Sequence, residues 1–119
     1  MIGWSLILLI ALIHLGILIM EMILWQRPLV RRVFRTTPEF AEATRVLAAN
    51  QGLYNGFLAA GLCLALWQGI PGKGQDMAIF FLACIAVAGI FGAMTVARRI
   101  LYVQTIPVLV AAAAVLAEV

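Results

Sequence analysis

IGWSLILLIALIHLGILIMEMILWQ, at residues 2–26, is an almost unbroken apolar run. It is long enough for a helix to cross the roughly 30 Å of hydrocarbon in a bilayer, which takes about 20 residues. Three further apolar stretches follow it, at residues 46–68, 77–97 and 100–117. Each is predicted to be helical, because a segment in lipid has to satisfy its own backbone hydrogen bonds. We therefore expect an all-α fold, an integral membrane four-helix bundle that forms a single transmembrane domain over residues 1–119.

The composition of the whole chain agrees with a lipid environment. Apolar residues make up 66% of the 119 residues and charged residues only 11%, against about 45 to 50% and about 25% in soluble domains. A soluble domain of this length would leave large apolar patches in water, which soluble proteins avoid. The composition thus excludes a disordered tail, a disulfide-rich secreted scaffold, a nucleic-acid binder and an ordinary cytosolic enzyme.

The basic residues predict an orientation in the membrane. Seven of the eight are expected on one side, namely Arg27, Arg31, Arg32, Arg35, Arg45, Arg98 and Arg99. Lys73 is alone on the other side, in the short turn between the second and third apolar stretches. Because basic loops stay in the cytoplasm, we expect both termini outside and two cytoplasmic connections.

The polar segment between the first two apolar stretches contains a helix start. Thr37, Pro38 and Glu39 are typical of an N-cap, a first helical position and an acidic first turn. Pro28 is interpreted as the end signal of the first helix. The four predicted helices are 2–26, 38–68 with its membrane part at 46–68, 77–97 and 100–117.

Two ionisable residues, His14 and Glu21, interrupt the first apolar run. They lie seven positions apart, nearly two turns, and therefore share one face of the helix. An ionisable group inside the bilayer costs about 2.5 to 3.5 kcal/mol on insertion scales, so such a residue usually faces protein or water and marks a function. We interpret both as candidate residues for binding a ligand or a proton.

Further polar side chains are expected at a similar depth. Counted from the arginines that mark the cytoplasmic boundary, Glu21, Asn50 and Gln104 each lie about 8 to 9 Å inside it along a helix. They predict a polar pocket in the cytoplasmic leaflet, with His14 at its floor. Its candidate residues are Glu21, His14, Asn50, Gln51, Tyr54, Asn55 and Gln104. The alternative is that these groups only hydrogen-bond neighbouring helices, as amides in membranes often do.

Small residues and one proline indicate how the helices pack. Gly52 and Gly56 form a GxxxG pair on the side of the second helix away from Asn50, which permits close helix contact within the chain or between protomers. Pro107 is expected to kink the fourth helix. The single orientation makes any homodimer a parallel one. With one His and no ligand-type spacing of Cys, His or acidic residues, the sequence supports no metal site and no cofactor.

Three segments carry a resemblance to a known family. They are HLGILIMEMILW at 14–25, TPEFAEATRVLAANQGLYNGFLAAGL at 37–62 and VAGIFGAMTVARRILYVQTIP at 87–107. With them, the chain resembles the small bacterial integral-membrane family named domain of unknown function 1304. The resemblance implies a compact four-helix protein of a bacterial cytoplasmic (inner) membrane, and it implies no reaction.

Three functions are compatible with these features. The favoured one is binding or proton-coupled transport of a small molecule, with Glu21 exchanging a proton or a substrate. The first alternative is a membrane enzyme that acts on a lipid-soluble substrate, with Glu21 and His14 as acid and base; their separation of about 10.5 Å along the helix counts against a direct relay. The second alternative is an accessory subunit of a membrane complex, in which the polar residues are saturated by internal hydrogen bonds.

Overall fold

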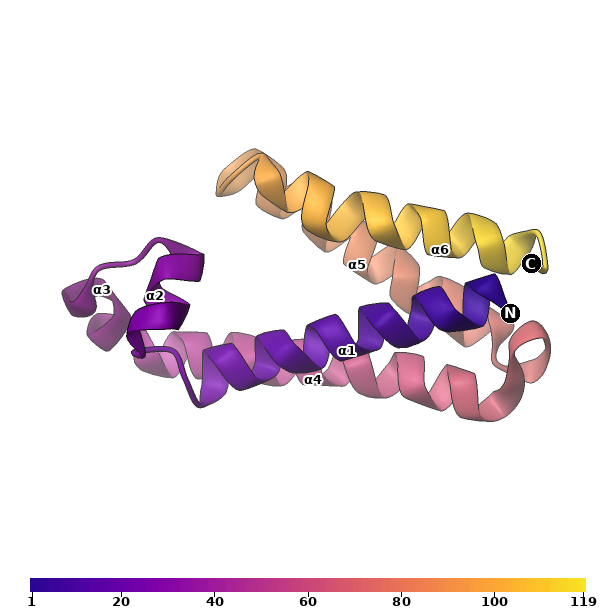
Figure 1. Ribbon diagram of the computed structural model, residues 1–119, viewed down its shortest axis with the longest axis horizontal. Helices are drawn as coiled ribbons and strands as arrows, with labels where there is room; N and C mark the ends of the chain where they lie inside the picture. Colours follow the sequence, from indigo (N-terminus) through magenta and orange to yellow (C-terminus); the bar gives the residue numbers. More distant parts are fainter. The chain divides into compact units, whose positions relative to one another are not determined.

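The computed structural model describes residues 1–119 and is helical almost throughout (Figure 1). Its elements, in chain order, are α1 (Ile2–Met22), α2 (Pro28–Phe34), α3 (Pro38–Ala43), α4 (Arg45–Gln68), the turn η1 (Gly69–Lys73), α5 (Gln75–Thr95), the π-type turn η2 (Leu101–Thr105) and α6 (Ile106–Leu116). In η1, the backbone of Ile70, Pro71 and Gly72 is not helical. No strand is present. The predicted all-α class is confirmed.

Three helices are long and apolar enough to cross a membrane. They are α1, α4 continued through η1, and α5. The fourth expected span is shorter, because η2 and α6 together form one apolar helix over Leu101–Leu116. The apolar runs therefore predicted the helices. Three of them have the length needed to cross a membrane, and the last one is shorter.

The first helix ends earlier than expected, at Met22 and not at residue 26. The residues that follow leave the helix because Trp25 makes tertiary contacts. Its indole Nε1 donates a hydrogen bond of 3.1 Å to Thr44 Oγ1, and its ring meets that of Phe34 edge-on, with 5.0 Å between the ring centroids. Helical propensity is a weak preference, which such contacts override.

Two short helices fill the segment between α1 and α4, and the sequence predicted only one of them. Thr37 caps α3 as expected, since its Oγ1 accepts a hydrogen bond of 3.1 Å from Phe40 N. The helix α2 was missed: Pro28, interpreted as an end signal, is the first residue of α2, a position where its missing N–H loses no hydrogen bond. The single helix expected over 38–68 is divided at Thr44, whose φ of −104° and ψ of 8° are not helical.

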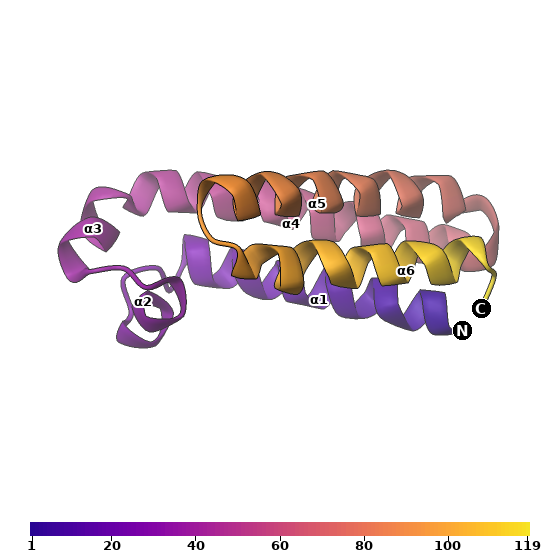
Figure 2. The same ribbon diagram turned by 90° about the horizontal axis from the view of Figure 1, so that it is seen from above.

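The chain forms two compact units. The first consists of Met1–Ala11 and Ala60–Val119, and the second is Leu12–Ala59. In the first unit α5 and α6 run side by side (Figure 2). The fully buried side chains of this unit include Ile7, Leu62, Leu82, Ile85, Val108 and Val115.

The turn η2 is held closely against α5. Thr105 Oγ1 donates a hydrogen bond of 3.2 Å to the Ala86 carbonyl. Gly89 lies so near that a Cβ at this position would meet the Thr105 hydroxyl and backbone nitrogen. The π-type turn ends two residues before Pro107, near which the sequence led us to expect an irregular helix.

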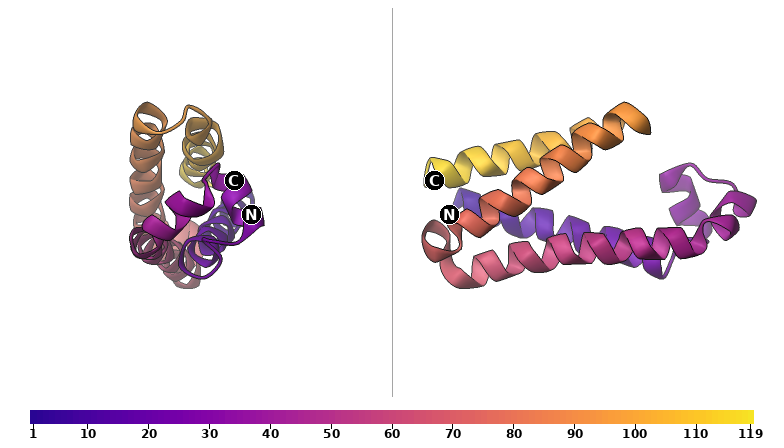
Figure 3. Two further views of the ribbon diagram at one scale, coloured as in Figure 1. Left: turned by 90° about the vertical axis from the view of Figure 1, so that its left-hand side faces the viewer. Right: turned by 180° about the vertical axis from the view of Figure 1, so that it is seen from behind.

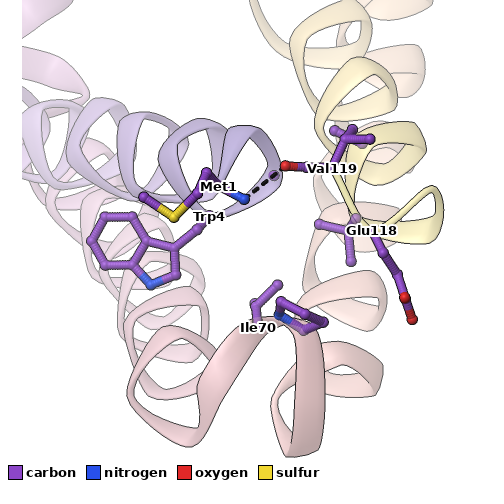
Figure 4. A pocket seen from close by; sticks show the side chains of 9 residues that line it. Met1, Trp4, Ile70, Glu118 and Val119 are labelled. Atoms are coloured by element: carbon purple, nitrogen blue, oxygen red, sulfur yellow. Dashed lines mark hydrogen bonds between the residues drawn. The ribbon is translucent and has the colours of Figure 1, made fainter.

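The first and last residues of the first unit lie together (Figure 4). The Met1 amino group donates a hydrogen bond of 2.7 Å to the Val119 carbonyl oxygen, and Ile2 N donates one of 2.6 Å to the same atom. The hollow beside them has a volume of about 10 Å³, which is at most the space of one water molecule. This hollow is therefore too small for an organic ligand.

In the second unit, α1 packs on α4, and α2 and α3 lie at the end of this helix pair (Figure 3). The GxxxG pair is at the contact. A Cβ on Gly52 would lie 2.7 Å from Met22 Cγ, and a Cβ on Gly56 would lie 2.5 Å from Leu18 Cδ1. The close helix contact expected from the two glycines is confirmed, and it is made within the chain.

Candidate functional site

Glu21 lies in the last turn of α1, one residue before the helix ends. Its partly buried carboxylate faces α4, where Asn55 Nδ2 donates a hydrogen bond of 2.8 Å to Oε1. The same amide nitrogen donates a hydrogen bond of 3.1 Å to the Gln51 carbonyl one turn earlier, which fixes the orientation of the Asn55 side chain. The structure thus joins two of the predicted site residues, Glu21 and Asn55.

Gly52 makes this contact possible. A Cβ at Gly52 would lie 3.0 Å from Glu21 Cβ and 3.2 Å from the Leu18 carbonyl oxygen. Because glycine has no Cβ, the backbone of α1 approaches that of α4 closely, as small residues allow in membrane helices. The Glu21 side chain is therefore within reach of Asn55, which follows Gly52 by nearly one turn.

Glu21 also borders a cavity of about 270 Å³, close to the lower end of the roughly 300 to 1,000 Å³ typical of ligand pockets. The cavity, called the Glu21 cavity below, is lined by Glu21, Met22, Ile23, Trp25, Gln26, Arg27 and Arg45. All of them belong to the second unit. One acidic and two basic residues thus border a space where α1 ends and α4 begins.

The two arginines reach the cavity from different elements. Arg27 precedes α2 with an extended backbone, φ −68° and ψ 144°, as the residue before a proline prefers. Its amide donates a hydrogen bond of 2.9 Å to the Leu24 carbonyl, which closes the turn after α1. The hydrogen bond from Trp25 to Thr44 ties this turn to the residue directly before Arg45. That contact holds both arginines near Glu21.

Other predicted site residues of this unit do not line the cavity. They are His14, Asn50, Gln51, Tyr54 and Asn55, the last of which contacts Glu21 from outside the cavity lining. Asn50, Gln51 and Tyr54 are exposed. His14 is buried, with 2% of its surface exposed, and lies about 10.5 Å from Glu21 along the helix axis. Gln104 is a partly buried residue of η2, in the first unit.

The comparison with known families agrees with the three quoted segments. A family model described as a protein of unknown function, DUF1304, matches residues 8–116. The chain belongs to this family. The matched region of the DUF1304 chain includes Glu21, Asn55 and every residue that lines the Glu21 cavity. No curated protein and no solved structure matches the chain.

Sequence reasoning missed Arg27 and Arg45 as site residues of this DUF1304 protein, because it interpreted both as orientation signals. Their positions could have identified them: they stand at the two ends of the segment that connects the helix of Glu21 with the helix of Asn55. The depth estimate for Glu21 also changes. It assumed a helix up to residue 26, whereas α1 ends at Met22, so Glu21 lies beside the connecting segment.

Proposed function

We propose that this DUF1304 protein is an integral membrane protein that binds a small molecule in the cytoplasmic leaflet and couples its binding or transport to a proton on Glu21. The observation that carries the proposal is the Glu21 cavity of about 270 Å³. Its carboxylate is partly buried and held by Asn55, and an ionisable group at such a place is usually functional. His14 does not line the cavity, so no observation favours acid and base chemistry by the pair.

We also propose four membrane crossings, with the arginine-rich segments on the cytoplasmic side of a bacterial inner membrane. The hydrogen bond of 2.7 Å between Met1 and Val119 supports an even number of crossings, because it places the first and last residues together. The fourth crossing is Leu101–Leu116, about 24 Å long at 1.5 Å per residue. Arg98 and Arg99 precede it, and side chains of this kind can extend to the headgroups when a helix is short.

Proton movement in liposomes tests the function. Vesicles that contain the reconstituted protein and an internal pH-sensitive dye would be given tetraphenylphosphonium, choline or glycerophosphoglycerol, which are a bulky cation, a small cation and an oxyanion. We expect one of them to drive proton movement in the wild type. Glu21→Gln should abolish it, since the amide cannot carry the proton, while Glu42→Gln, an exposed acidic residue of α3, should not. Proton movement that survives Glu21→Gln, or none with any probe, overturns the proposal.

Cysteine labelling tests the topology. The native Cys63 and Cys84 would be replaced by alanine, and a single cysteine placed at the exposed position 42 or 73. A membrane-impermeant maleimide should label Lys73→Cys in intact cells and Glu42→Cys only after the cells are opened. Labelling of both from the same side would refute the four-crossing arrangement.

A further inference from the structure

The charges of the Glu21 cavity indicate what kind of ligand it takes. Two basic residues, Arg27 and Arg45, line the same space as one acidic residue, Glu21. The cavity is therefore positively charged whether Glu21 is ionised or neutral. A cavity built to hold a cation would require the opposite balance of charge.

The hydrogen bond of the Glu21 carboxylate does not involve Arg27 or Arg45. It comes from the neutral amide of Asn55, at 2.8 Å, and both Arg27 and Arg45 are exposed. Arg31 differs from them, because it is engaged in the fold: its Nε donates a hydrogen bond of 3.2 Å to the Gln26 carbonyl. Arg27 and Arg45 are thus accessible to a ligand in the cavity.

We propose that the Glu21 cavity binds a phosphate ester, with the phosphate between Arg27 and Arg45 and with Glu21 as the site of the accompanying proton. This inference rests on the proposed function and names its ligand class. Guanidinium groups bind phosphate through paired hydrogen bonds, and a phosphate has enough oxygens for two arginines that approach from different elements. The apolar residues Met22, Ile23 and Trp25 also line the cavity, which suits an organic group on the phosphate better than a bare inorganic ion.

The charge of Glu21 determines whether protonation strengthens or weakens phosphate binding. An ionised carboxylate in the cavity repels the phosphate, and a neutral one does not. The charged and polar residues around Glu21 are Arg27 and Arg45, which line the same cavity, and Asn55 from α4; no second acidic residue lines the space. Phosphate binding and protonation of Glu21 therefore favour each other, because coupling between two binding events is reciprocal. Binding is expected to be tighter at pH 5 than at pH 8.

Trp25 reports binding, since it lines the cavity. The chain has three tryptophans, so the variant Trp4→Phe/Trp67→Phe keeps Trp25 alone. The full chain in an uncharged maltoside detergent would be titrated with two phosphodiesters, soluble glycerophosphoglycerol and dioctanoyl phosphatidylglycerol. Diesters are chosen because a monoester has its own titration near pH 6. We expect a saturable change in Trp25 fluorescence with at least one of the two diesters. A response to the lipid alone identifies a headgroup site. A response to the soluble diester identifies a site for soluble phosphates.

The variants separate the cavity from general charge attraction. Arg27→Gln and Arg45→Gln should each weaken binding about tenfold or more, the effect of losing a charged hydrogen bond. Arg27→Lys and Arg45→Lys, which keep the charge but lose the planar fork, should bind several-fold more weakly and serve where a Gln variant does not fold. Arg32→Gln removes the same charge from α2 outside the cavity and should leave binding unchanged. Glu21→Gln should tighten binding at pH 8 and remove the difference between the two pH values.

Three results overturn the inference. The first is equal weakening by Arg32→Gln and Arg27→Gln, which indicates diffuse attraction. The second is loss of phosphodiester binding in Glu21→Gln. The third is a Trp25 response to tetraphenylphosphonium but to neither diester, which leaves the proposed function standing with a cationic ligand. If phosphodiesters bind but no proton movement is seen in liposomes, the proposed phosphate site stands and proton-coupled transport is wrong.

Discussion

Gly52 is the position where a single methyl group should disturb the site most directly. In Gly52→Ala the new Cβ would lie 2.7 Å from Met22 Cγ, 3.0 Å from Glu21 Cβ and 3.2 Å from the Leu18 carbonyl oxygen. Ordinary contacts of this kind are 3.4 to 4 Å long. Met22 Cγ can rotate away, but the other two atoms are fixed by the backbone of α1. The clash is therefore relieved only if α1 and α4 move apart by a few tenths of an ångström.

The expected loss of stability follows from two opposing contributions. Overpacking a close contact costs about 1 to 3 kcal/mol, whereas alanine is favoured over glycine inside a helix by about 0.8 to 1 kcal/mol. Moving the helices apart also lengthens the hydrogen bond of 2.8 Å between Asn55 and Glu21. We expect Gly52→Ala to lower the free energy of unfolding by about 1 to 2 kcal/mol in total.

Two other glycines of the same unit are matched controls. A Cβ at Gly16 of α1 meets nothing within 4 Å, so Gly16→Ala should show only the helix preference and stabilise by up to about 1 kcal/mol. A Cβ at Gly56 meets only the Leu18 side chain, whose flexible end can move, so the effect of Gly56→Ala should lie between those at Gly16 and Gly52.

Reversible unfolding in mixed micelles of dodecyl sulfate and maltoside, followed by circular dichroism, measures all three free energies of unfolding. The expected order of stability is Gly16→Ala, then Gly56→Ala, then Gly52→Ala. If Gly52→Ala is as stable as Gly16→Ala, α1 does not approach α4 at Gly52, and the explanation given for the Glu21 and Asn55 contact is wrong.

Two further predictions use the same assay. Asn55→Leu removes the amide donor of the Glu21 carboxylate and should lower the free energy of unfolding by about 1 to 3 kcal/mol. Asn50→Leu, at an exposed position of the same helix, should change it by less than about 0.5 kcal/mol. Equal effects would contradict the pairing of Asn55 with Glu21. Thr44→Val removes the acceptor of the Trp25 indole and should lower the free energy of unfolding by about 1 kcal/mol. It should also shift the fluorescence of Trp25. If the fluorescence does not shift, the turn after α1 is not held by this hydrogen bond.

The features that could be predicted from the sequence are those that depend on few neighbours. The helices follow from the length of the apolar runs, and the start of α3 follows from the Thr37 hydroxyl and the residues just after it. The end of α1 could not be predicted in this way. It depends on Trp25 meeting Thr44 and Phe34, which are distant in the sequence, and nothing in the apolar run up to residue 26 indicates that the helix stops before it.

The same distinction applies to the site. Glu21 could be identified because an ionisable residue in an apolar run is costly, and Asn55 was one of several polar candidates on α4. Which of them meets Glu21 depends on how α4 is rotated against α1, and Gly52 determines that rotation by permitting the closest approach. At about 100° per residue, Asn55 lies about 60° from Gly52 around the helix and Asn50 about 160° from it. Once Gly52 faces α1, Asn55 is beside the contact and Asn50 points away.

Arg27 and Arg45 show why a count of charges does not reveal a site. The positive-inside rule uses only the side of the membrane on which a basic residue lies, so all seven basic residues of the connections are equivalent in the sequence. The fold separates them, because the turn after α1 and the start of α4 bring these two to the Glu21 cavity. Replacing either one still leaves six basic residues against Lys73, and the expected orientation is kept. A loss of phosphate binding in Arg27→Gln or Arg45→Gln would therefore be an effect on the cavity and not on the direction of insertion.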